Sequence, residues 1–155
     1  MKKLKQKYFF LLIILQSFML FGCTLLNENT YPKFTVSKSV YKNAETDPTC
    51  EIGGVYFNFY NKSKNNIESM EIRMRVFDRT TRQMAFPGIG TIISILECDI
   101  QSKEHKKFCI SLDSYITIFS NSDYLIDEFY ISKIRYSDGS VWEDKYGIYA
   151  VSSED

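Results

Sequence analysis

The amino-acid sequence predicts an all-β domain, an antiparallel β-sandwich of about seven strands. The 133 residues from Cys23 onward have the length of one domain and include eight Phe, ten Tyr and one Trp, residues that favour strands. Apolar and polar side chains alternate with a period of two along several segments, as in strands that bury one face. Turn-forming residues separate these segments at intervals of roughly 8 to 15 residues, which is typical of sandwiches.

The clearest alternation lies in two successive segments. Apolar side chains at alternate positions mark both of them: Val55, Phe57 and Phe59, then Met70, Ile72, Met74 and Val76. Between them, Asn61–Asn66 is polar and is expected to be a solvated turn, so the two segments are predicted to form an antiparallel hairpin. A helix over Ile67–Phe77 is the alternative, because Glu and Met favour helices, but the strict alternation favours a strand.

The remaining strands are predicted from shorter patterns. They are Phe34–Tyr41, Thr91–Cys98, Phe108–Leu112, Tyr130–Tyr136 and a short strand that starts at Val141–Trp142 and that Tyr146–Val151 is expected to finish or extend. Ile131 and Ile134 differ in parity, so burying both requires a bulge near Ser132 or Lys133. Gly139 in Ser137–Ser140 favours a tight hairpin turn, whereas a brief turn of helix is expected over Asp123–Glu128.

The first 22 residues have the layout of a secretory signal. Four lysines precede a mostly apolar segment, Tyr8–Phe21, and no acidic residue is present. An uncleaved anchor is one alternative, but ~14 residues of helix span ~21 Å, less than a ~30 Å hydrocarbon core. An ordinary cleaved signal followed by an incidental Cys is the other.

The end of this segment resembles a bacterial lipobox of the spirochaete type. Leu20 stands three residues before Cys23 and the small Gly22 directly before it, while Phe21 is bulkier than is usual there. The resemblance implies that a signal peptide, residues 1–22, is removed after Gly22 and that Cys23 becomes the lipidated N-terminus. Residues 23–33 would then be a polar tether and 34–151 the sandwich domain. The protein would be held on a membrane of the cell envelope, on its periplasmic or surface face, by acyl chains worth ~0.8 kcal/mol per methylene.

A second resemblance concerns the domain. Asn58–Asn61 followed by Arg75-Val76-Phe77-Asp78, together with the closing Ile134–Trp142 segment, resembles the immunoglobulin-like, FxLYD-type domains of bacterial lipoproteins. It covers residues 55–142. It implies an immunoglobulin-like sandwich and carries no catalytic residue with it.

Three cysteines follow Cys23 and leave alternatives open. Cys98 and Cys109 flank Asp99–Lys107 and would face each other across a hairpin, which makes them the candidate disulfide. Cys50 pairing with either, or three reduced thiols, are the alternatives. Zinc with His105 as a further ligand is less favoured, because no two cysteines have C-x-x-C spacing. We therefore expect no metal site.

The sequence holds no motif of catalysis. His105, the single histidine, lies in a charged stretch, and neither a nucleophile elbow nor a phosphate loop occurs. The acidic pairs at Glu97 and Asp99, Asp127 and Glu128, and Glu143 and Asp144 are expected to be solvated surface. No catalytic residue and no cofactor is therefore expected. Trp142 with Tyr136 could form a ligand platform, but a place in the core is favoured.

The net charge of the chain from Cys23 onward limits the classes of partner that it can bind. Four of the 19 basic residues precede Cys23, which leaves 15 against 19 acidic residues, a net charge of −4. A mildly acidic surface argues against nucleic acid, which needs a basic face. We expect a non-enzymatic binding or scaffold module with an envelope protein or glycan as partner. A small envelope hydrolase using Glu97, Asp127 or Glu143 is the alternative.

Overall fold

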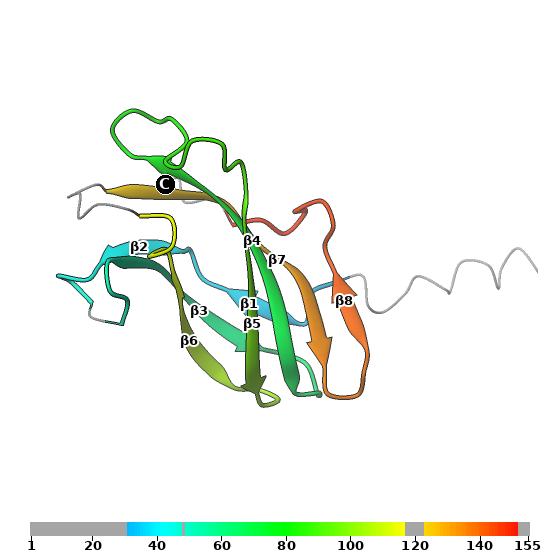
Figure 1. Cartoon of the computed structure of the whole chain (residues 1–155). Coiled ribbons are helices and arrows are strands. Elements are labelled where there is room, and N and C mark those ends of the chain that lie inside the picture. Colours follow the sequence, from blue (N-terminus) through cyan, green and yellow to red (C-terminus); the bar gives the residue numbers. More distant parts are fainter. Residues whose placement is uncertain (1–30, 48, 117–122, 152–155) are drawn as a thin grey trace, which may run out of the picture. The chain divides into compact units, whose positions relative to one another are not determined.

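The computed structural model describes residues 31–47, 49–116 and 123–151, and the chain from Pro32 onward forms one compact unit. The described residues form strands and no helix (Figure 1). The eight strands are β1 (Phe34–Val36), β2 (Val40–Asn43), β3 (Gly53–Asn61), β4 (Ile67–Asp78), β5 (Ile92–Ile100), β6 (His105–Ser111), β7 (Tyr124–Tyr136) and β8 (Val141–Glu143).

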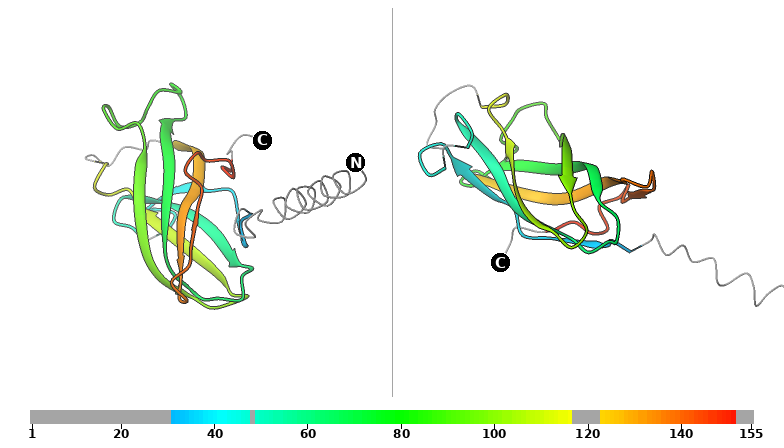
Figure 2. Two further views of the ribbon diagram at one scale, coloured as in Figure 1. Left: turned by 90° about the vertical axis from the view of Figure 1, so that its right-hand side faces the viewer. Right: turned by 90° about the horizontal axis from the view of Figure 1, so that it is seen from below.

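The strands form two sheets in which every pairing is antiparallel. In the first sheet β3 is central, with β6 on one side and β1 and β2 in succession along the other. The second has the order β5-β4-β7-β8. The views in Figure 2 show the sheets as two layers. Strands β1, β3 and β6 correspond in order to strands A, B and E of an immunoglobulin-like sandwich, and β5, β4, β7 and β8 to strands C′, C, F and G. The predicted all-β sandwich is confirmed, with eight strands in place of about seven.

The core lies between the two sheets, where the predicted inward faces meet. The alternating residues of β3 and β4 are all buried, including Val55, Phe59 and Met74. Ring contacts join the layers: Phe57 of β3 packs on Phe129 of β7 with centroids 5.0 Å apart. Trp142 is buried and lies edge-on to the ring of Phe34. It therefore belongs to the core and not to a ligand platform.

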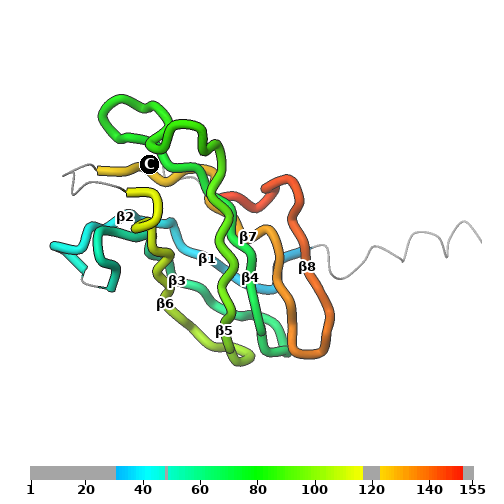
Figure 3. Tube along the Cα trace, in the orientation of Figure 1, coloured from blue at the N-terminus to red at the C-terminus, as the bar shows by residue number. Residues whose placement is uncertain are grey.

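The predicted hairpin between β3 and β4 is wrong. The two strands belong to different sheets, and the chain crosses from one layer to the other over Asn61–Asn66 (Figure 3). An apolar face on each strand is buried equally well in one sheet or in two facing sheets, so the alternation predicts the faces and not the layer that each strand joins. The crossing is not simply solvated either, because Asn61 is 0% exposed and Ser63 is also buried.

Strand β7 confirms one local prediction and corrects another. Glu71 pairs with Lys133 and Ile72 with Ile131, so Ser132 is the extra residue of a bulge, and both Ile131 and Ile134 are buried. Asp123–Glu128 does not form the expected helical turn. Tyr124 to Glu128 are strand residues instead, because Leu125 and Ile126 are needed in the pairing with β4 and in burial.

The ends of the domain differ partly from expectation. The hairpin of β7 and β8 is confirmed, with Gly139 at φ 81° in its turn. The predicted first strand is divided into β1 and β2 by Ser37–Ser39, where Ser37 Oγ accepts a hydrogen bond from the N–H of Asn58 at 2.9 Å. The segment Tyr146–Val151 is a loop, and only Val151 bridges to Phe129.

Candidate functional site: an open edge strand and a pair of thiols

The outer face of the β5-β4-β7-β8 sheet carries charges that alternate from strand to strand. Glu71 of β4 lies opposite Lys133 of β7, which lies opposite Glu143 of β8. Lys133 Nζ is 3.1 Å from a Glu143 carboxylate oxygen. Because opposite charges are neighbours across the ladder, this part of the face is electrostatically satisfied without any ligand.

A shallow hollow lies on the same face, next to β5. Its lining side chains come from β4 and from the strands on either side of it, β5 and β7. The hollow is lined by Ser69, Met70, Glu71, Ile95, Glu97, Lys133 and Arg135. A ligand in the hollow would therefore contact the apolar side chain of Ile95 on β5 as well as acidic and basic side chains.

Strand β5 forms the edge of this sheet and pairs only with β4 among the described residues. Its outward side chains include Ile93, which is 51% exposed, and Ile95, which is 65% exposed. No charge occurs from Ile92 to Leu96. An edge strand with free backbone groups and apolar side chains is a template for pairing with another chain.

The other edges of the sandwich are protected. Strand β8 has three residues, the β1–β2 edge is broken at Ser37–Ser39, and β6 carries Lys106 and Lys107. Short strands, interruptions and lysines all discourage strand addition. Lys106 also blocks strand addition at one end of β5, because its Nζ donates a hydrogen bond to the carbonyl of Asp99 at 3.0 Å. The open part of the β5 edge is therefore Ile92 to Glu97.

The carboxylates proposed for a hydrolase do not form a catalytic pair. Glu97 lies on β5 and Glu143 on β8, at opposite edges of the sheet, and Asp127 accepts from the N–H of Glu128. The hydrogen bond from Lys133 lowers the pKa of Glu143, whereas a general acid needs a raised one. His105 stacks on the ring of Tyr60 with centroids 4.1 Å apart.

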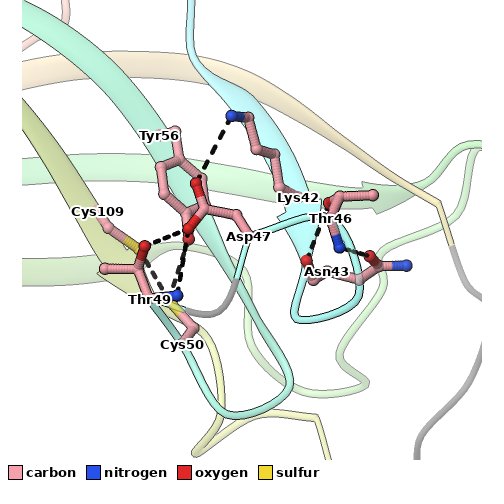
Figure 4. Close-up of polar contacts among 8 residues, drawn as sticks. All are labelled: Lys42, Asn43, Thr46, Asp47, Thr49, Cys50, Tyr56 and Cys109. Carbon is pink, nitrogen blue, oxygen red and sulfur yellow. Dashed lines mark hydrogen bonds and ion pairs between the residues drawn. The ribbon is translucent and has the colours of Figure 1, made fainter.

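The structure corrects the predicted pairing of Cys98 with Cys109. Cys98 is in β5 and Cys109 in β6, and these strands belong to different sheets because the chain between them crosses the layers. Cys109 lies instead beside Cys50, in the loop before β3, with the two Sγ atoms 2.7 Å apart (Figure 4). Among the described residues, no disulfide bond joins Cys50, Cys98 or Cys109.

Polar side chains surround this thiol pair. The hydroxyl of Tyr56 lies 3.7 Å from Cys50 Sγ, and Asp47 bonds to Thr49 and lies 3.7 Å from Lys42 Nζ (Figure 4). Burial, together with the hydrogen bond with Cys50, raises the pKa of Cys109 to about 12. The Cys109 sulfur is therefore a thiol at neutral pH and a poor nucleophile in the folded state.

The loop that carries Cys50 is held by Asp113. Its carboxylate accepts hydrogen bonds from the N–H groups of Glu51, Ile52 and Gly53 at 3.0, 2.8 and 3.0 Å. The bond from Gly53 contributes most to a pKa of about 2 for Asp113. The sequence does not reveal this role of Asp113, because an isolated Asp after a strand gives no sign of a partner some 60 positions away.

The described residues include no group of three His, Cys, Asp or Glu side chains arranged to hold a metal ion. They also include no helix that is long and apolar enough to cross a membrane. Gly22 and Cys23, the predicted cleavage and lipidation positions, lie outside the described residues.

The sequence matches no protein family and no curated protein. Among solved structures, the chain is similar to a hypothetical protein from Peptoclostridium difficile 630. The TM-score is 0.54 at 10% sequence identity, over 79% of this chain and 95% of that one. At this identity the likeness concerns the fold, and it agrees with the all-β sandwich.

Proposed function

We propose that this chain is a lipid-anchored module of the cell envelope that binds an extended segment of a partner protein along β5. Anchoring at Cys23 is supported by the lipobox-like Leu20–Cys23 after an apolar signal. Binding rests on one observation, the unpaired apolar edge from Ile92 to Glu97. A partner strand would gain backbone hydrogen bonds there and would cover Ile93 and Ile95.

A protein segment suits this surface better than a glycan or a nucleic acid. The groups on offer are backbone N–H and C=O groups and isoleucine side chains, and Trp142 is withdrawn into the core. The hollow beside Ile95 adds Glu97 on one side and Lys133 and Arg135 on the other, so it can receive one polar side chain of the added strand. Nothing in this arrangement forms a basic surface for phosphates.

Site-specific photo-crosslinking on intact cells tests this function. We expect a photo-reactive residue at Ile95 to give one discrete crosslinked product with another protein. The same residue at Val40, which is also exposed but lies on the broken edge of the other sheet, is the matched control and should give none.

A second variant links the product to strand addition. Ile93→Lys places on the edge the charge that natural edge strands use against pairing, and we expect it to abolish the product while the melting temperature stays within a few degrees. Equal products from Ile95 and Val40, a product of twice the chain's own mass, or a product that survives Ile93→Lys would overturn the proposal.

A further inference from the structure

The two sulfurs of Cys50 and Cys109 are closer than an ordinary contact between heavy atoms. Their separation is 2.7 Å, whereas nonbonded contacts are about 3.5–4.0 Å and a disulfide bond is about 2.05 Å. Movement of ~0.7 Å, less than one bond length, brings them to bonding distance. The two residues are 59 positions apart, so this approach is produced by the fold and not by the local chain.

The backbone around the pair keeps this space for the sulfurs. A Cβ atom at Gly54 would lie 2.5 Å from Cys50 Sγ and 2.6 Å from Cys109 Sγ, so no side chain fits at this position of β3. Tyr56, two residues on, lies directly opposite Cys109 in the register of β3 and β6. The strand pairing fixes Cys109, and the Asp113 carboxylate fixes the loop at Glu51, next to Cys50.

We propose that Cys50 and Cys109 form a disulfide bond in the exported protein, which fastens the β2–β3 loop to β6. A disulfide-bearing oxidant takes the electrons. The thiolate of one cysteine attacks it and releases one thiol, and the second cysteine then attacks the mixed disulfide and releases the other. Two protons pass from the cysteines to the two released thiols, and one S–S bond forms as one is broken.

The surroundings favour retention of this bond once it has formed. Cys50 is buried and Cys109 is half-buried, so a reductant reaches them poorly in the folded domain. Cys98 is left without a cysteine partner among the described residues, and burial raises the pKa of its thiol to about 11. It is therefore slow to exchange with the Cys50–Cys109 bond.

Mass spectrometry of the purified full chain tests the pairing. The protein is unfolded and reduced in denaturant, refolded in oxidised glutathione, alkylated in denaturant without reduction and digested. We expect a linked peptide containing Cys50 and Cys109, lighter than the two thiol peptides by two hydrogen atoms, with Cys98 alkylated. Alkylation of Cys50 and Cys109, or a linkage of either to Cys98, would refute the proposal. This readout does not depend on lipidation or on a partner at β5.

Thermal unfolding with and without reductant gives a second test. If Cys50 and Cys109 stabilised the domain only by packing as thiols, reductant would not change the melting temperature. Unfolding in dithiothreitol should lower the melting temperature of the oxidised wild type by on the order of 10 °C. Cys50→Ser, Cys109→Ser and the double variant should melt low and show no response to reductant. Cys98→Ser is the matched control and should respond like the wild type. A wild-type melting temperature that is independent of reductant would overturn the proposal.

Discussion

Asp113 shows how one side chain positions a whole loop. Its carboxylate receives three backbone N–H groups in succession, from Glu51 to Gly53, where the chain enters β3. These bonds favour the charged form and hold the pKa of Asp113 at about 2, below the usual value of 3.8. Between these two values the unfolded chain binds a proton that the folded domain does not, so this stabilisation is complete above about pH 4 and is lost as the pH falls toward 2.

We therefore expect Asp113→Asn to lower the melting temperature at pH 7 by several degrees, because the amide accepts at one atom and carries no charge. The difference between wild type and variant should shrink as the pH falls from 5 to 2, and melting curves by circular dichroism across this range measure it. Asp99→Asn is the control, since that carboxylate bonds only to the side chain of Gln101. A difference that stays constant with pH would show that folding does not lower the pKa of Asp113.

At the scale of elements, the chain passes between the layers three times, at β3–β4, β5–β6 and β6–β7, and the first two of these crossings meet at Asn61. Its Nδ2 donates to the carbonyls of Asn65 at 2.9 Å and Gln101 at 3.0 Å, while Oδ1 accepts from the N–H of Ser63 at 3.0 Å. Asn65 belongs to the β3–β4 crossing and Gln101 to the β5–β6 crossing. One buried amide thus fixes the ends of four strands from both sheets.

We expect Asn61→Asp to destabilise the domain by ~2–4 kcal/mol, since it has the same shape but removes both donors and places a buried charge against two carbonyl oxygens. Urea unfolding followed by tryptophan fluorescence measures the loss. Asn58→Asp, on the exposed side of the same strand, is the matched control and should change stability by less than ~1 kcal/mol. Similar midpoints for the two variants would contradict the role of Asn61.

Strand faces could be predicted from the sequence and strand partners could not. The alternation in 70–77 depends only on the pleat, so it identifies Met74 as core, and the parity of Ile131 and Ile134 is enough to place a bulge. Pairing depends on which layer a strand joins. The polar Asn61–Asn66 therefore suggested a solvated hairpin, although Asn61 is buried in a crossing.

The edge position of β5 and the pairing of Cys50 with Cys109 could not be predicted from the sequence for the same reason. The pattern of Thr91–Cys98 predicts a strand, but its place at the edge follows only from the sheet order. The pairing of Cys109 with Cys50 in place of Cys98 follows from the β5–β6 crossing, which puts Cys98 and Cys109 in different sheets. Chemistry built from residues about 60 positions apart has no local pattern, so topology had to be known first.

At the scale of the whole molecule, the proposed attachment to a membrane depends on the acyl chains alone. The chain from Cys23 onward has a net charge of −4, so an anionic membrane surface repels it slightly on average. Acyl chains contribute ~0.8 kcal/mol per buried methylene, and two or more of them make attachment stable. Losing the lipid should therefore release the protein completely, with no residual electrostatic binding.

We expect cells that produce the full chain to incorporate labelled palmitate into the wild type and not into Cys23→Ala, and we expect the variant to leave the membrane fraction. Label is read by autoradiography after immunoprecipitation, and location by fractionation in low and high salt. Cys98→Ala is the matched control, because it removes a different thiol and should keep both label and membrane. Equal labelling of Cys23→Ala would remove the lipoprotein proposal. Unlabelled Cys23→Ala that remained on the membrane in high salt would show that some other part of the chain, and not the acyl chains, holds it there.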